Sequence, residues 1–193
     1  MFFKRITSIP PIPSELLIFD SAVDIELSDT GYGKRFVKDG RLLKNAGYSN
    51  SIPLQPELIK WIREHVPGVS QSDITYQVSE HPVCGTHIVH SDINRKYALN
   101  YIFETGGHDA YTNWFQEKDK PLHRNKESGN RQSDSGIVNY KNLELLASVR
   151  IPINTWVLIA TDILHDVDVV IGQRKSITIS IKDEEALTKL GLL

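Results

Sequence analysis

The segment from Trp156 to Ile181 constrains the fold of this chain more than any other part of the sequence. Its residues, WVLIATDILHDVDVVIGQRKSITISI, are rich in Val, Ile and Thr, which favour strands. They predict three short strands, over 156–160, 164–171 and 174–181. The chain is therefore expected to fold back on itself here as antiparallel strands.

The last of these strands alternates between polar and apolar residues. Arg174, Ser176 and Thr178 point to one face, and the isoleucines between and after them point to the other. The polar row cannot face a dry core, because burying an unpaired guanidinium is too costly. If Gly172–Gln173 closes a two-residue hairpin, His165 shares the face of Arg174. We therefore expect an imidazole, a cation and hydroxyl groups to line one functional surface.

A second polar pattern lies in residues 86–92, THIVHSD. His90 and Asp92 are two positions apart, so their side chains project to the same side of an extended segment. With a second imidazole they make a 2-His-1-carboxylate set, which binds iron(II) and leaves coordination positions open. His165 is the candidate for that second imidazole. His87 is expected to point the opposite way and to be structural.

Together these residues resemble the 2-oxoglutarate/iron(II)-dependent oxygenases of the prolyl-hydroxylase-like type. That family's pattern is H-x-D, a distal His, then an Arg with a Ser or Thr two positions later. Here the pattern is His90-Ser91-Asp92, His165 and Arg174-Lys175-Ser176, and the resemblance covers roughly residues 75–182. It implies that His90, Asp92 and His165 bind the iron as the catalytic centre. It also implies that Arg174 and Ser176 bind the far carboxylate of 2-oxoglutarate.

The resemblance further implies the reaction. The chain would be an oxidoreductase that hydroxylates a substrate with O2 and 2-oxoglutarate and releases succinate and CO2. Tyr97 and Asn100 lie on the next predicted strand, where the family draws further 2-oxoglutarate contacts, but they fall on opposite faces, so only one is expected to serve. Arg95 has two interpretations, an ion pair with Asp92 or a contact with the substrate.

Two other functions remain open from the sequence. A cupin-like metalloenzyme that does not use 2-oxoglutarate would explain the metal ligands but leave Arg174 and Ser176 without a role. A non-catalytic jelly-roll binding module would leave all of these residues unexplained. The substrate, a small molecule or a protein side chain, is not indicated, and neither is an oligomeric state.

About eight short strands with few helices predict a mainly β fold, a double-stranded β-helix (jelly roll, cupin-like). We expect one domain over 1–193, made of an N-terminal support at 1–70 with a helix at 56–66, a jelly-roll core at 71–182, and a short C-terminal helix at 183–191. Trp114 and Trp156 are expected in its core. The charged stretch 118–139 predicts an inserted loop, either a substrate lid or disordered.

Composition excludes several classes of protein. The 193 residues carry a net charge of −2, which gives no general attraction to nucleic acid or to anionic membranes. Cys84 is the single cysteine, so an internal disulfide framework and a cysteine zinc cluster are excluded. No apolar run is long enough to cross a membrane, and the prolines at 10, 11 and 13 interrupt any secretory signal. We expect a cytoplasmic protein.

Overall fold

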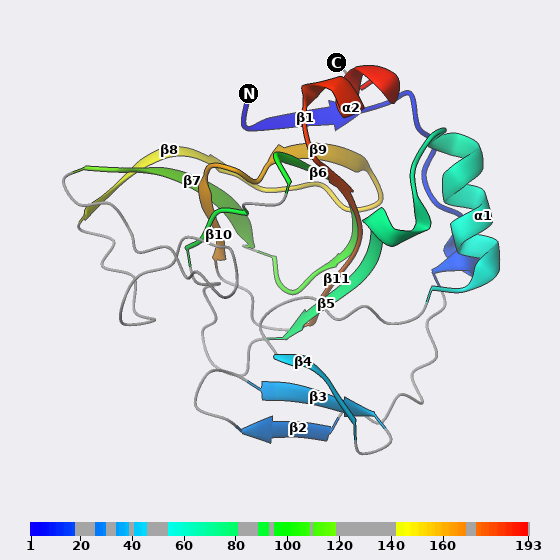
Figure 1. Cartoon of the computed structure of the whole chain (residues 1–193). Helices are drawn as coiled ribbons and strands as arrows, with labels where there is room; N and C mark the ends of the chain where they lie inside the picture. The colour runs from blue at the N-terminus through cyan, green and yellow to red at the C-terminus, as the bar shows by residue number, and fades with distance from the viewer. Residues whose placement is uncertain are drawn as a thin grey trace.

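The protein is mainly β, with two antiparallel sheets that hold eight strands and a separate group of three short strands (Figure 1). The computed structural model describes residues 1–17, 26–29, 34–38, 41–45, 54–80, 89–92, 95–108, 110–118, 142–168 and 173–192. The predictions for Cys84, His87 and most of the 118–139 segment lie outside these residues. The third group consists of β2 (Glu26–Asp29), β3 (Lys34–Lys38) and β4 (Arg41–Asn45).

The larger sheet has five strands in the order β1-β9-β6-β11-β5. The strands are β1 (Phe3–Ile6), β9 (Trp156–Ala160), β6 (Tyr97–Thr105), β11 (Gln173–Ile181) and β5 (Ile74–Glu80). All neighbouring pairs are antiparallel. The predicted strands 156–160 and 174–181 are thereby confirmed, and both lie inside the sheet rather than at its edge.

The smaller sheet has three strands in the order β10-β7-β8, with β10 (Leu164–Asp168), β7 (Tyr111–Glu117) and β8 (Leu143–Val149). The segment around His90 lies along the other edge of β10, because His90 and His165 form an antiparallel bridge. The His90 amide donates to the His165 carbonyl at 3.0 Å, and the His165 amide donates to the His90 carbonyl at 2.8 Å.

Two short α-helices flank the larger sheet. α1 (Pro56–His65) confirms the predicted helix and begins with proline in its first turn, where the missing amide hydrogen costs nothing. Gly68 follows its end at a φ of +86°, a backbone conformation that favours glycine. α2 (Glu184–Lys189) begins at Asp183, whose side chain accepts a 2.9 Å hydrogen bond from the Ala186 amide. Two 3-10 turns, Ser14–Leu16 and Gln71–Asp73, complete the described helical structure.

The two faces of the five-stranded sheet are covered differently. On one face the isoleucines of β11 pack with Leu58 and Ile62 of α1, as the apolar stripe of that helix predicts. On the other face Ala98, Ile102, Val157 and Ile159 pack with Trp114 of β7, between the two sheets; the rest of that buried cluster is Ile151. Figure 1 shows α1 on one side of the large sheet and β7, β8 and β10 on the other. Trp114 and Trp156 are fully buried, so both are core residues as expected.

The predicted hairpin between residues 164–171 and 174–181 is wrong. β10 belongs to the smaller sheet, whereas β11 pairs with β5 and β6 in the larger one. Both faces of β11 are buried, so its alternation separates an apolar core from a polar interior, not core from solvent. The chain crosses from one sheet to the other between β10 and β11. The prediction was wrong because it assumed that both strands belong to one sheet and are joined by a tight turn.

No helix among the described residues is long and apolar enough to cross a lipid bilayer.

Candidate functional site

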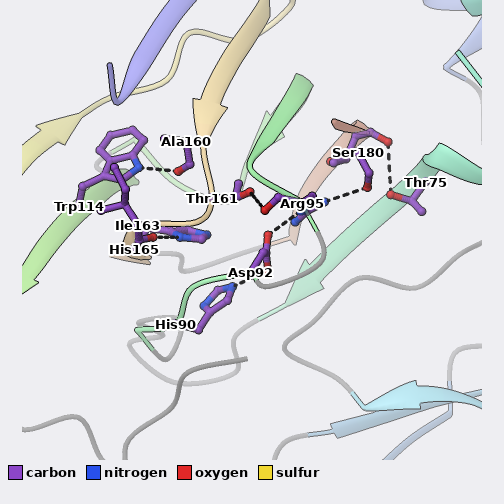
Figure 2. Close-up of polar contacts among 11 residues, drawn as sticks. Thr75, His90, Asp92, Arg95, Trp114, Ala160, Thr161, Ile163, His165 and Ser180 are labelled. Atoms are coloured by element: carbon purple, nitrogen blue, oxygen red, sulfur yellow. Dashed lines mark hydrogen bonds and ion pairs between the residues drawn. The ribbon is translucent and has the colours of Figure 1, made fainter. Parts of the chain in front are cut away.

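The three predicted metal ligands come together where the segment 89–92 runs beside β10 (Figure 2). The ring centroids of His90 and His165 are 4.5 Å apart, and Nε2 of His90 is 3.9 Å from Oδ1 of Asp92. The Asp92 amide donates to the Thr161 carbonyl at 2.7 Å, which fixes the backbone just before β10. The cluster therefore depends on main-chain pairing between two segments far apart in sequence.

His165 has one nitrogen fixed by the backbone. Its Nδ1 lies 2.8 Å from the Ile163 carbonyl oxygen, which can only accept, so Nδ1 carries the proton and Nε2 keeps its lone pair. Burial, followed by the neighbouring His90, lowers the pKa of His165 to about 3. The imidazole is thus neutral at physiological pH, in the tautomer that binds a metal through Nε2.

Asp92 is ionised despite being largely buried. Burial alone would raise the pKa of its carboxyl, but the positive charge and the hydrogen bond of Arg95 act against burial, and the pKa lies below its ordinary value. Arg95 Nε donates to Asp92 Oδ2 at 2.5 Å. Of the two interpretations of Arg95, the structure shows the ion pair with Asp92.

The donor set fits iron(II) by type. Two imidazoles and one carboxylate are the ligands of the 2-His-1-carboxylate iron sites, and His165 presents the required lone pair. The side chains do not yet meet at one point: within the described part of the chain, no group of three or more His, Cys, Asp or Glu is arranged to hold an ion as it stands. The Asp92 carboxylate is paired with Arg95 instead. The residues are adjacent and chemically suited, and an ion would have to draw them together.

Arg174 is a buried cation without a counter-charge among the residues that the structure describes. Its side chain lies on β11, it is 8% exposed, and its guanidinium makes one long hydrogen bond, 3.5 Å from Nη1 to the Thr105 carbonyl. Among the described residues no carboxylate pairs with it. Burial lowers its pKa to about 10, which still leaves it charged at neutral pH. A buried guanidinium without a partner is costly, so this position is suited to an anionic ligand.

Arg174 and His165 point into the same interior from opposite sheets. His165 is opposite Trp114 in the register of β10 and β7, and Trp114 packs against the inner face of the large sheet. On β11, Ser176 and Thr178 share the face of Arg174, and Thr178 is paired with Asn100 of β6. Asn100 is two positions from both Ala98 and Ile102, so it shares their face, which is packed against Trp114. The predicted surface is therefore not the face of one hairpin: by register, its residues lie on the facing sides of two sheets.

Several polar atoms in this region have no partner in the described part of the chain. Asn100 Oδ1, Thr178 Oγ1 and Thr112 Oγ1 are buried and make no hydrogen bond with a described residue. Unsatisfied buried polar atoms are rare in folded proteins, and a ligand is one physical reason for retaining them. Thr112 was missed by the sequence analysis, since a threonine in a strand carries no signal until the strand's inner face is known.

Tyr97 and Asn100 separate as their spacing predicts. The Tyr97 hydroxyl donates to Glu184 Oε1 at 3.3 Å, beside α2, so Tyr97 does not face the interior between the sheets. Asn100 lies on the inner face, opposite Thr178. Asn100 is therefore the one of the two that is placed beside the polar interior, together with Ser176.

In comparisons with known proteins, no family model matches the chain, and no curated protein matches it.

Proposed function

We propose that this chain is a non-haem iron(II) and 2-oxoglutarate-dependent dioxygenase that hydroxylates a substrate. The observation that carries the proposal is the buried Arg174 guanidinium, which has no carboxylate partner among the described residues. By strand register it lies on the face of the large sheet that is turned toward the sheet of His165. Metal ligands alone would suit a cupin-like enzyme equally well. A buried cation on the facing sheet suits an anionic cosubstrate. 2-Oxoglutarate would offer it a second carboxylate, because its 2-oxo acid end would bind the metal.

We also propose that the two sheets form a double-stranded β-helix. From β5 onward the chain passes from the large sheet to the segment at His90, back to β6, then to β7 and β8, back to β9, across to β10, and back to β11. Alternation of this kind between two facing antiparallel sheets supports a jelly roll. Such a fold would place the metal ligands on one sheet and the cosubstrate cation on the other.

In this proposal each side chain has a distinct task. His90, Asp92 and His165 would hold the iron, which when bound supplies the redox chemistry for activating O2. Arg174 would orient the far carboxylate of 2-oxoglutarate through its planar pair of donors, which a lysine cannot imitate.

Smaller groups would complete the cosubstrate site. Ser176, Asn100 and Thr178 offer hydroxyl and amide groups on the same inner face. Trp114 and the apolar residues around it pack between the two sheets and would limit the access of water to that region. In the overall reaction one oxygen atom of O2 enters the substrate and the other enters succinate, with release of CO2.

The decisive experiment measures succinate in the absence of substrate. Purified chain is incubated in air with iron(II) and 2-oxoglutarate, and slow succinate formation that requires the iron is expected. Arg174→Met should abolish it. Lys175→Met is the matched control, because Lys175 pairs with Glu104 at 2.7 Å on the other face of β11.

The alternatives predict different results in the same experiment. Iron binding without any succinate would favour a cupin-like metalloenzyme that does not use 2-oxoglutarate. Absence of both iron binding and succinate would favour a binding module. Either result would contradict the proposed function.

A further inference from the structure

Arg95 occupies a junction between three parts of the fold. Its Nε donates to Asp92 Oδ2 at 2.5 Å, and its Nη1 donates to Ser180 Oγ on β11 at 3.4 Å. Its carbonyl oxygen accepts from the Thr161 hydroxyl at 3.4 Å. Figure 2 shows Arg95 between Asp92 on one side and Ser180 on the other. One side chain therefore links the predicted metal ligand to the strand that carries Arg174.

We propose that Arg95 is a positioning residue that fixes how Asp92 meets the metal, so that a single carboxylate oxygen coordinates. This inference rests on the proposed function. Arg95 engages Oδ2, whereas Oδ1 lies 3.9 Å from His90 Nε2. The oxygen left for the metal is thus the one that lies close to His90.

The backbone of Asp92 is held as firmly as its side chain. The Asp92 amide donates to the Thr161 carbonyl at 2.7 Å, and the Thr161 hydroxyl donates to the Arg95 carbonyl at 3.4 Å. The Thr161 amide in turn donates to the Lys96 carbonyl at 3.0 Å. The main chains of Asp92 and Arg95 are therefore tied to the same residue at the start of the turn into β10, which keeps the two side chains within reach of each other.

Single-oxygen coordination matters for the reaction. A facial triad works by leaving open positions on the metal. A second carboxylate oxygen would occupy one of the positions needed for the 2-oxo acid and O2. By holding Oδ2 away, Arg95 would keep that position open, and it would also hold the carboxylate in the orientation the metal requires.

If Arg95 instead competed with the metal for Asp92, its removal would change metal affinity in the opposite direction. Removing Arg95 would then strengthen metal binding. The geometry favours positioning, because Arg95 holds one oxygen and leaves Oδ1 directed toward His90.

The test uses manganese(II) and cobalt(II) as probes on the full, untagged chain under anaerobic conditions. Arg95→Met keeps the length of the side chain and removes its charge and donors. We expect its manganese(II) affinity to fall by about 10- to 100-fold. The absorption spectrum of bound cobalt(II) should change as well, because a freed second oxygen alters the coordination. Arg95→Lys, which keeps the charge without the Nε donor, should lie between Arg95→Met and the wild type.

Lys96→Met is the matched control. Lys96 is the next residue and also forms an ion pair, but with exposed Glu184 at 2.8 Å, so its loss should leave affinity and spectrum unchanged. Thermal unfolding of each metal-free variant separates loss of metal binding from loss of the fold. If Arg95→Met does not fold, Arg95→Lys decides the question by the same two measurements.

Unchanged affinity and spectrum in the Arg95 variants would overturn the inference, and so would tighter binding. In both cases the proposed function would stand, because the wild type would still bind metal. Failure of the wild type itself to bind manganese(II) would overturn the proposed function and this inference with it.

Discussion

At the scale of single residues, the polar interior is the most informative part of the molecule. Arg174, Asn100 and Thr178 all bury polar groups whose hydrogen-bonding capacity the described residues leave wholly or largely unused. Each lowers the stability of the ligand-free protein, since an unpaired buried polar group loses its hydration without compensation. We expect a bound ligand to form the hydrogen bonds that these groups lack.

The first prediction concerns Arg174→Lys. The substitution keeps the charge and removes the planar pair of donors, so 2-oxoglutarate should bind more weakly while metal affinity is unchanged. The loss of one charge-assisted hydrogen bond should raise KM for 2-oxoglutarate by about tenfold or more, measured by succinate formation. Lys175→Arg at the neighbouring position, on the opposite face of β11, is the control. An unchanged KM in Arg174→Lys would remove Arg174 from the cosubstrate site.

The second prediction concerns Thr178→Val, which replaces a fully buried hydroxyl without a hydrogen bond by a methyl group of the same shape. The ligand-free protein should gain on the order of 1 kcal/mol in free energy of unfolding, while KM for 2-oxoglutarate rises. Urea denaturation and succinate assays measure the two effects. Thr161→Val is the comparison, because its hydroxyl has a partner in the Arg95 carbonyl and its loss should destabilise. Destabilisation by Thr178→Val would show that its hydroxyl is satisfied in solution.

At the scale of secondary-structure elements, one face of β11 is expected to serve stability and the other the proposed function. Its isoleucines pack on the side of α1, and its polar residues face the smaller sheet. α1 therefore supports the strand that carries Arg174 without contributing to the polar interior. Substitutions on the two faces should have different consequences.

The third prediction tests this separation with Ile62→Ala, which removes a fully buried side chain of α1. The free energy of unfolding should fall by about 2–5 kcal/mol through loss of burial and creation of a cavity. KM for 2-oxoglutarate should not change at temperatures where the variant is folded. The side chain of Lys60 is 78% exposed, so Lys60→Ala should change neither the free energy of unfolding nor KM. A rise in KM that accompanies the loss of stability would mean that the two faces are coupled.

Most elements are predictable from sequence because local patterns determine them. The extents of β9 and α1, and the burial of Trp114 and Trp156, follow from residue type, periodicity and the positions of proline and glycine. Pairing between strands does not follow. The expected hairpin failed because the sequence contains no sign that the chain changes sheets between β10 and β11.

For the candidate site too, residue types could be predicted from the sequence but long-range contacts could not. His90, Asp92 and His165 could be named from their spacing and residue type, and the structure brings them together. The ion pair of Arg95 with Asp92 remained one of two interpretations, and its link to Ser180 was not foreseen, because that contact joins residues 85 positions apart. The unpaired Thr112 hydroxyl could not be recognised before its strand's inner face was known.

At the scale of the whole molecule, the proposed site joins two sheets that meet in one interior. A ligand held from both sheets should stabilise the entire fold, since binding to the native state alone shifts the unfolding equilibrium. Metal and cosubstrate should act in sequence, because the 2-oxo acid is expected to need the metal.

The fourth prediction follows from this linkage. Manganese(II) at one hundred times its Kd should raise the free energy of unfolding of the wild type by about 2.7 kcal/mol, and 2-oxoglutarate should add to that increase. In Arg174→Met the metal-dependent part should remain and the 2-oxoglutarate-dependent part should disappear. Thermal or urea unfolding under anaerobic conditions measures both. Stabilisation by 2-oxoglutarate without metal would contradict the proposed order of binding.

The bridge between His90 and His165 has a consequence for insertions and deletions. The two imidazoles are opposite each other because their main chains exchange two hydrogen bonds. Lengthening β10 by one residue before His165 would turn its imidazole to the outer face, however conservative the inserted residue. Insertions elsewhere, at positions that no strand pairing covers, leave the register intact. We therefore expect insertions and deletions in the paired segments to disrupt the site. An engineer who exchanges neighbouring segments must keep the pairing of His90 with His165.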